Sequence, residues 1–284
     1  MKDFKNRVAA ITGAASGMGR ELALELARRG CHLALCDIDA AGLDATAASA
    51  ASANAGVRVT RLRVDVAERD AVYAWADRAA SEHGRVNLVF NNAGVALSAP
   101  LEKVRHQDFE WIMGINFWGV VWGTQAFLPH LRASGEGHVI NTSSLFGLMA
   151  MPLNGCYNAS KFAVRAYTEA LRMELELAEA PVSATCVHPG GVRTAIARNA
   201  RMDPSSAAIT GIDPEAARRR FDKLLDATSA PSAALQILRA VERNRRRVLV
   251  GGDARVADKL VRLLGSWYQP LVVARARRMA RAQE

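Results

Sequence analysis

Arg-Val-Ala-Ala-Ile-Thr (Arg7–Thr12) runs directly into Gly13-Ala14-Ala15-Ser16-Gly17-Met18-Gly19, and this stretch decides the fold. The apolar run predicts a buried strand, and the residues after the glycines predict a helix that continues to Arg29. A glycine-rich turn between strand and helix lets the backbone approach a pyrophosphate and aims free amides at it. The spacing Gly-x-x-x-Gly-x-Gly differs from the commoner Gly-x-Gly-x-x-Gly, so the turn predicts a nucleotide site only together with other motifs.

The alternation of strand and helix continues along the chain. Further strands are expected at residues 32–36, 57–64, 86–90, 138–141, 182–187 and 247–250, and helices at 68–83, after Phe109, 154–179 and 232–242. Short connections between them favour a parallel sheet covered by helices on both faces. We predict a doubly wound α/β fold with roughly seven parallel strands over residues 1–251, including a substrate lid at about 195–229.

Composition narrows the class of protein. The chain has 284 residues, 50% of them hydrophobic, which fits one large domain. Its four cysteines show neither a disulfide spacing nor a metal-ligand pattern, and the charged N-terminus shows no secretion signal, so we expect a metal-free protein in a reducing cytoplasm. The net charge of +9 comes largely from arginine clusters, which we interpret as solvated faces and interface contacts rather than a nucleic-acid site.

Two apolar segments could either contact a membrane or pack within the protein, and the first is residues 111–129. The uncharged stretch from Trp111 to Pro129 is interrupted by polar residues and glycines, so a buried helix is favoured over a membrane span. On this helix Trp111, Ile115, Trp118 and Trp122 share one stripe, with Asn116 nearly opposite to Trp118.

Residues 252–284 predict a C-terminal helical extension. Its apolar stripe is formed by Val256, Leu260, Leu264, Trp267 and Leu271, it lies opposite Arg255, Asp258 and Arg262, and it is expected to break at Pro270. Packing on its own domain or on a partner subunit is favoured, and peripheral membrane contact stays open.

The pair Tyr157 and Lys161 stands one helical turn apart, thirteen residues after Ser144. A free tyrosine has a pKa near 10 and is a poor acid or base at neutral pH. A neighbouring ammonium favours the phenolate and should lower that pKa, as a residue that moves a proton requires.

Polar residues also follow other strands of the predicted sheet. Asp37 ends the second strand, where a carboxylate can accept hydrogen bonds from ribose hydroxyls and repel a 2′-phosphate, so NAD is preferred over NADP. Asp65-Val66 could border the adenine, and Asn91-Asn92-Ala93-Gly94 should line the carboxyl edge of the sheet.

These motifs together resemble the short-chain dehydrogenase/reductase family of Rossmann-fold oxidoreductases. The resemblance covers about residues 5–251 and rests on Thr12 to Gly19, Asn91 to Gly94, Asn116, Ser143-Ser144, Tyr157-x-x-x-Lys161 and Pro189-Gly190. It implies that Tyr157 is the acid/base, Ser144 orients the substrate oxygen, Asn116 holds a water in the proton relay, and Lys161 binds the nicotinamide ribose. The cofactor residues that it implies are Gly13, Ser16, Gly17, Met18, Gly19, Asp37, Asp65, Val66, Asn92, Ala93, Gly94, Tyr157, Lys161, Pro189, Gly190, Val192 and Thr194. It also implies a homodimer or homotetramer.

The expected substrate pocket is mostly apolar. Its walls are predicted to be Val95, Leu97, Leu145, Leu148, Met149, Leu153 and Asn154. A lipophilic secondary alcohol or ketone fits such walls, although Arg193 and Arg198 in or near the lid could reach inward. Two alternatives stay open: an NADPH-dependent 3-oxoacyl reductase, and a protein that senses NAD without turnover.

Overall fold

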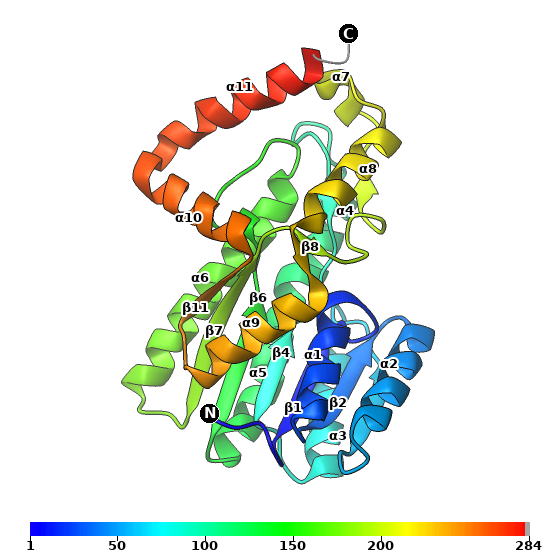
Figure 1. The fold of residues 1–284 in the computed structure, drawn as a ribbon, viewed down its shortest axis with the longest axis vertical. Coiled ribbons are helices and arrows are strands. Elements are labelled where there is room, and N and C mark those ends of the chain that lie inside the picture. Colours follow the sequence, from blue (N-terminus) through cyan, green and yellow to red (C-terminus); the bar gives the residue numbers. More distant parts are fainter. Residues whose placement is uncertain (282–284) are drawn as a thin grey trace.

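The computed structural model describes residues 1–281 and contains one seven-stranded sheet in which every strand pairing is parallel (Figure 1). The strand order is β11-β7-β6-β4-β1-β2-β3. The strands are β1 (Val8–Thr12), β2 (His32–Asp37), β3 (Val59–Arg63), β4 (Leu88–Asn91), β6 (Gly137–Thr142), β7 (Val182–Pro189) and β11 (Arg247–Val250). The order reverses direction between β1 and β4, and in open parallel sheets ligands bind at the carboxyl ends of strands beside such a reversal. The predicted doubly wound fold is confirmed.

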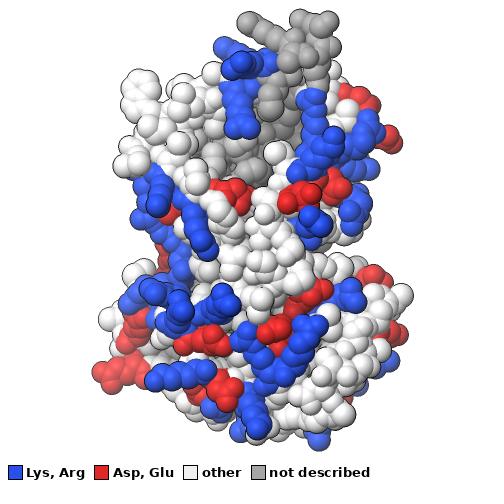
Figure 2. Space-filling view, in the orientation of Figure 1, with Lys and Arg blue, Asp and Glu red and all other residues white. Residues whose placement is uncertain are grey.

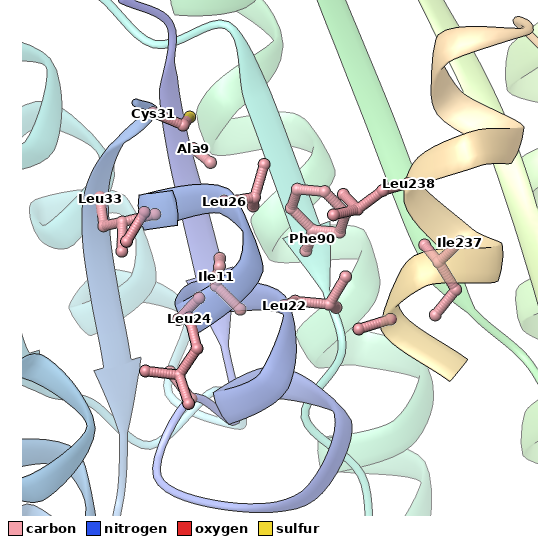
Figure 3. Packing of buried hydrophobic residues seen from close by; sticks show 14 of the residues in the cluster. Ala9, Ile11, Leu22, Leu24, Leu26, Cys31, Leu33, Phe90, Ile237 and Leu238 are labelled. Carbon is pink, nitrogen blue, oxygen red and sulfur yellow. The ribbon is translucent and has the colours of Figure 1, made fainter. Parts of the chain in front are cut away.

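Three helices cover each face of the sheet. One face carries α1 (Gly17–Arg28), α2 (Ala40–Ala53) and α9 (Ala230–Glu242), and the other carries α3 (Arg69–His83), α5 (Gly119–Ala133) and α6 (Gly155–Leu177). Side chains of β1 alternate between the two cores, with Ile11 on the first face and Ala10 on the second. Figure 3 shows Ile11 packed with Leu22 and Leu26 of α1, and Phe90 beside Leu238 of α9. Both faces of the sheet are therefore covered by apolar side chains of the flanking helices.

Several shorter elements lie at the carboxyl end of the sheet. They are β5 (Leu97–Ser98), α4 (His106–Met113), the π-helix η1 (Gly114–Trp118), the 3-10 helix η2 (Leu145–Gly147) and β8 (Val192–Arg193). The predicted lid contains β9 (Arg201–Met202), α7 (Ser206–Thr210), α8 (Pro214–Leu224), η3 (Leu225–Ala227) and β10 (Thr228–Ser229). Strand β9 pairs with β5 and β10 pairs with β8, so backbone hydrogen bonds attach the lid to the main domain at both of its ends.

The single long helix expected after Phe109 is wrong in one respect, because η1 interrupts it. Through a π-helix the turn widens, so a stripe calculated at 100° per residue does not persist. Trp111 packs in a small cluster beside Ile112, whereas Trp122 packs against the core under α3 and α5. Trp118 is 44% exposed and stacks on Trp122 with 4.9 Å between ring centroids. Among the described helices, none has the length and apolarity needed to cross a membrane.

The C-terminal extension forms α10 (Gly252–Leu264), η4 (Gly265–Trp267) and α11 (Tyr268–Arg281). Two details of its prediction are wrong. The break lies at Gly265, whose φ of 53° is a left-handed conformation open to glycine, while Pro270 sits in the first turn of α11, where its missing N–H costs nothing. The apolar stripe does not pack on its own domain, because Asp258 on the opposite side of α10 is buried while Val256 and Leu260 are exposed. Figure 1 shows the two helices as an arch beyond the carboxyl end of the sheet.

The lack of a disulfide spacing among the four cysteines agrees with the structure. All four are free and buried.

Candidate active site

The glycine-rich turn is shaped by contacts that exclude a side chain. Gly13 has a φ of 66°, and a Cβ on Gly19 would stand 2.1 Å from the carbonyl oxygen of Gly13. A Cβ on Gly17 would meet Thr194 at 3.0 Å, so the turn and the segment after β7 are in contact across the sheet edge. Among the described residues, the Ser16 side chain makes no capping hydrogen bond to α1. The first amides of α1 are therefore available to a phosphate, as a dinucleotide requires.

Asp37 and Thr12 hold this turn against the neighbouring strands. The Asp37 carboxylate accepts hydrogen bonds from the backbone N–H of Ala15 at 2.8 Å and of Asp39 at 3.0 Å. The Thr12 hydroxyl accepts from the amides of Asn92 at 2.9 Å and Ala93 at 3.0 Å. The carboxylate therefore stands at the end of β2 beside the glycines, where the sequence placed it. The residues Asp65 and Val66 follow β3, with Asp65 accepting from the Ala67 amide at 2.9 Å.

The Asn91–Gly94 segment is fixed from both sides of β4. The Asn92 side chain donates to the carbonyl of Thr12 at 3.1 Å. Asn91 donates to Asn141 at 2.8 Å and to Thr124 at 3.1 Å in a buried network. A Cβ on Gly94 would lie 3.2 Å from Asn116 Oδ1 and 3.3 Å from Lys161 Nζ, so these groups approach one another around a bare backbone.

Asn116 lies in the π-helix and is completely buried. Its Oδ1 accepts from the Val95 amide at 2.8 Å, and its Nδ2 donates to the Val95 carbonyl at 3.0 Å and to the Ser160 hydroxyl at 3.1 Å. Both amide hydrogens are thus committed, and only the second lone pair of Oδ1 is left for a water. π-turns are frequent at functional sites because they re-aim one side chain within a helix.

Ser144 and Tyr157 meet between η2 and the first turn of α6. The Ser144 hydroxyl lies near the Tyr157 hydroxyl and favours its ionised form, and the Phe146 ring packs edge-on against the Tyr157 ring with 6.1 Å between centroids. Ser144 also accepts from the Phe146 amide at 3.1 Å, which fixes the serine rotamer. Two hydroxyls therefore face one position, where a substrate oxygen could receive a hydrogen bond from one and a proton from the other.

The electrostatics of the pair differ from the sequence prediction. Burial raises the pKa of Tyr157 above its ordinary value, and the hydrogen bond with Ser144 opposes this rise. Lys161 Nζ lies 5.7 Å from the centroid of the tyrosine ring and donates to the Thr142 carbonyl at 3.1 Å. Burial also lowers the pKa of Lys161 from 10.5 to about 8. The expected lowering of the tyrosine pKa is thus wrong for the protein alone, because burial outweighs an ammonium that faces the ring rather than the hydroxyl.

The segment after β7 completes the ring of residues. His188 is buried, and its Nδ1 lies 3.0 Å from the Ser144 carbonyl. Pro189 ends β7, Val192 pairs with Thr228 across β8 and β10, and Thr194 reaches the glycine turn. The amide of Gly191 donates to Asp253 at 2.6 Å, so the C-terminal extension begins with a bond to this segment.

Comparison with known proteins agrees with this geometry. The family model of the short chain dehydrogenases matches residues 7–205. The chain belongs to the short-chain dehydrogenase/reductase family.

Relatives of the family match most of the chain. An oxidoreductase named SadH from Mycobacterium tuberculosis is 48% identical over 274 residues, covering 96% of each chain. The C alpha-dehydrogenase of Sphingobium sp. is 34% identical, covering 74% of this chain and 68% of its own. A solved short chain dehydrogenase/reductase from Burkholderia phymatum, in complex with NAD, has a TM-score of 0.85 at 31% identity and covers 94% of this chain and 96% of its own.

As a short-chain dehydrogenase/reductase, the protein is an oxidoreductase that acts on CH–OH groups with a nicotinamide cofactor. The donor set fits that group. Glycines admit the pyrophosphate, free amides of α1 face it, and a carboxylate stands at the end of β2.

The predicted pocket residues lie on three segments of the chain, residues 95–97, 145–149 and 153–154. Leu97 is 3% exposed and packs with Ile112 and Cys156, with Val95 and Tyr157 beside them. Leu148 and Met149 are buried after η2, and Leu153 has a φ of 63° next to Asn154. The two arginines that could have reached inward form ion pairs within the lid region: Arg193 with Asp226, and Arg198 with Asp222 at 3.7 Å. Both arginine side chains are more than half exposed.

Sequence reasoning missed residues that act by contact. Tyr268, in the first turn of α11, is 7% exposed, and its hydroxyl accepts from the Ala150 amide at 3.0 Å. Asp253 and Thr12 hold backbone amides at two edges of the site. The position of Thr12 at the end of an apolar strand could have indicated its role. The contact of Tyr268 joins residues 118 positions apart, so no local sequence pattern predicts it.

Proposed function

We propose that this enzyme interconverts a lipophilic secondary alcohol and its ketone with NAD. The observation that carries the substrate class is the apolar cluster against which Tyr157 packs, with Arg193 and Arg198 paired with Asp226 and Asp222. A pocket of this kind offers no fixed cation to a carboxylate or phosphate substrate.

Each residue then has a defined task. A nicotinamide cofactor held by the glycine turn would accept or supply the hydride of the carbinol carbon. In the oxidation, Tyr157 accepts the proton of the alcohol hydroxyl while Ser144 holds the same oxygen by a hydrogen bond. In the reduction, Tyr157 returns that proton to the ketone oxygen. Lys161 holds the ribose end of the cofactor, and its positive charge makes loss of the tyrosine proton less costly once the site is closed.

Asn116 connects the tyrosine to the rest of the relay in this proposal. Its anchoring by Val95 and Ser160 leaves an oxygen lone pair beside Lys161 and Gly94. A water held there would pass the proton from the tyrosine–lysine pair toward solvent.

The choice of NAD rests on Asp37, whose charge disfavours a 2′-phosphate. Arg63 is the register partner of Asp37 on β3 and donates its Nε to the Ile38 carbonyl at 3.1 Å. This arginine is the feature that an NADPH-dependent 3-oxoacyl reductase would use, so the cofactor decides between the two activities.

A homodimer is part of the proposal. Trp118, Phe162 and Met173 are large apolar side chains that η1 and α6 leave exposed by 44%, 38% and 56%. A second copy with the same face would cover them by isologous pairing. Sedimentation velocity should show a dimer that Trp118→Asp converts to a monomer.

The direct test is an NAD-coupled absorbance screen across lipophilic secondary alcohols, with NADP in parallel. Turnover with NAD and its loss in Tyr157→Phe, with NADH binding preserved, is the expected result. Turnover restricted to NADPH and 3-oxoacyl thioesters would replace this function by the alternative. Binding of NADH without turnover of any alcohol or ketone would point to a sensor.

A further inference from the structure

Helix α10 turns its polar face toward the protein and its apolar face toward solvent, the reverse of an ordinary surface helix. Its buried residues are Ala254 and Asp258, and the large apolar residues lie outward. Asp258 forms ion pairs with Arg262 at 3.0 Å and Arg247 at 3.6 Å, so a carboxylate rather than a leucine faces the body of the protein. Asp253 fixes the start of α10 by accepting from the Gly191 amide, and Tyr268 fixes the start of α11 by accepting from the Ala150 amide.

The outward face of α10 is an apolar stripe. Val256, Leu260 and Leu263 follow one another at intervals of four and three residues, which places them on one line along this helix. Their exposed fractions are 67%, 41% and 85%, and two further large apolar side chains after the break at Gly265, Trp267 and Leu271, are 74% and 56% exposed. Such a concentration of exposed large apolar side chains marks a surface that another apolar phase covers.

The charges beside the stripe have one sign. Residues 252–281 contain seven Lys or Arg and two Asp. Both aspartates, Asp253 and Asp258, are engaged with the body of the protein. Arg255, Lys259 and Arg262 are exposed on α10, with Lys259 next to the stripe, and Arg275, Arg277 and Arg278 are exposed on α11. Figure 2 shows Lys and Arg side chains along this end of the molecule beside uncharged surface.

We propose that the outer face of α10 and α11 binds the surface of an anionic lipid bilayer. The apolar stripe enters the boundary between headgroups and acyl chains, with the Trp267 indole at headgroup level. The flanking Lys and Arg extend to the lipid phosphates.

The positive charge of this face favours an anionic lipid surface over a second copy of the chain as its binding partner. Isologous pairing through this face would bring two basic surfaces together without an acidic group to neutralise them. A bilayer with anionic headgroups supplies both the apolar phase and the opposite charge. The proposal stands independently of the substrate, since it concerns only the helices.

The test is co-sedimentation of the full-length protein with vesicles of phosphatidylcholine alone or mixed with phosphatidylglycerol. We expect binding to the mixed vesicles that weakens with added salt, and little binding to phosphatidylcholine alone. Leu263→Asp should lower the partition coefficient about tenfold or more, because a carboxylate then enters the interface. The combination Arg275→Gln, Arg277→Gln and Arg278→Gln should lower it by a similar factor.

A matched control separates the face from general effects. Leu177 at the end of α6 is 86% exposed, so Leu177→Asp makes the same chemical change on another surface and should leave vesicle binding unaltered. Circular dichroism and turnover of a water-soluble alcohol should be the same in Leu263→Asp and in the parent. Absence of vesicle binding by the parent protein, or equal binding by Leu263→Asp, would overturn the proposal. A Leu263→Asp variant that changes the sedimentation coefficient of a parent that ignores vesicles would assign the face to a protein interface instead.

Discussion

The imidazole of His188 holds the carbonyl of Ser144 through Nδ1, at 3.0 Å, in the interior of the site. A carbonyl oxygen can only accept, so Nδ1 carries the hydrogen and His188 is the donor. Burial lowers the pKa of His188 to about 4, and the ring is therefore neutral at pH 7. This bond fixes the backbone of the residue whose hydroxyl meets Tyr157, and it makes His188 a positioning residue.

Removing that bond should slow the chemical step. In His188→Leu the Ser144 carbonyl loses its donor, and we expect kcat to fall about tenfold to a hundredfold, because small displacements of reacting groups are costly. His188→Asn retains an amide donor near the position of Nδ1 and should recover most of kcat. Steady-state kinetics with NADH affinity measured by fluorescence would distinguish this from loss of cofactor binding. Equal kcat in the Leu and Asn variants would contradict the positioning role.

Asp37 should control the choice of cofactor. Asp37→Asn removes the charge and keeps one oxygen, which can accept from the Ala15 amide of the glycine turn, while the bond from the Asp39 amide is lost. We expect NADH to bind about tenfold more weakly and NADPH to bind more tightly, with Arg63 beside the new amide. Asp39→Asn is the control, since Asp39 caps α2 by accepting from Gly42 at 3.1 Å. Titration of both variants with both cofactors checks the prediction, and an unchanged ratio of affinities in Asp37→Asn would refute it.

The sequence alone predicted the fold class correctly, because that class follows from the local alternation of strand and helix patterns. The residues of the relay stay a prediction. Strand β1 is an apolar run, and the turn after it needs glycines. Both features can be read from neighbouring residues, and the folded structure keeps them. Three features could not be predicted from the sequence. The π-helix η1 changes the number of residues per turn, and the pKa of Tyr157 depends on burial. The side chain of Asp258 faces inward because it pairs with Arg247, which lies on β11. Each depends on contacts between segments far apart in the sequence.

Tyr268 should act on substrate affinity. Tyr268→Phe removes the acceptor of the Ala150 amide and frees the segment that carries Leu148 and Met149. We expect KM for lipophilic alcohols to rise several-fold with kcat and NADH affinity little changed, and stability to fall by about 1 kcal/mol. Tyr73→Phe, which removes an exposed hydroxyl bonded to Gln125 at 3.3 Å, is the matched control. A Tyr268→Phe enzyme with the KM of the parent would show that α11 does not support the pocket.

Stability in acid should depend on His138, which is buried in β6. Its Nε2 lies 2.8 Å from the Thr185 hydroxyl. That hydroxyl donates to the Arg245 carbonyl at 2.6 Å, so Nε2 must be the donor. Burial lowers the pKa of His138 from 6.5 to about 3. Between these two values the unfolded chain binds a proton that the folded protein does not, and stability therefore falls as the pH drops below 6.5.

The size of this effect can be measured by substitution. From pH 7 to pH 5 we expect His138 to contribute a loss of about 2 kcal/mol in the free energy of unfolding. His138→Gln keeps a donor for Thr185 but cannot titrate, so its stability should fall by about 2 kcal/mol less than that of the parent over the same range. Urea unfolding of both proteins at the two pH values measures the difference, and buried His188 contributes equally to each. Parallel losses in the two proteins would mean that His138 titrates normally in the folded state.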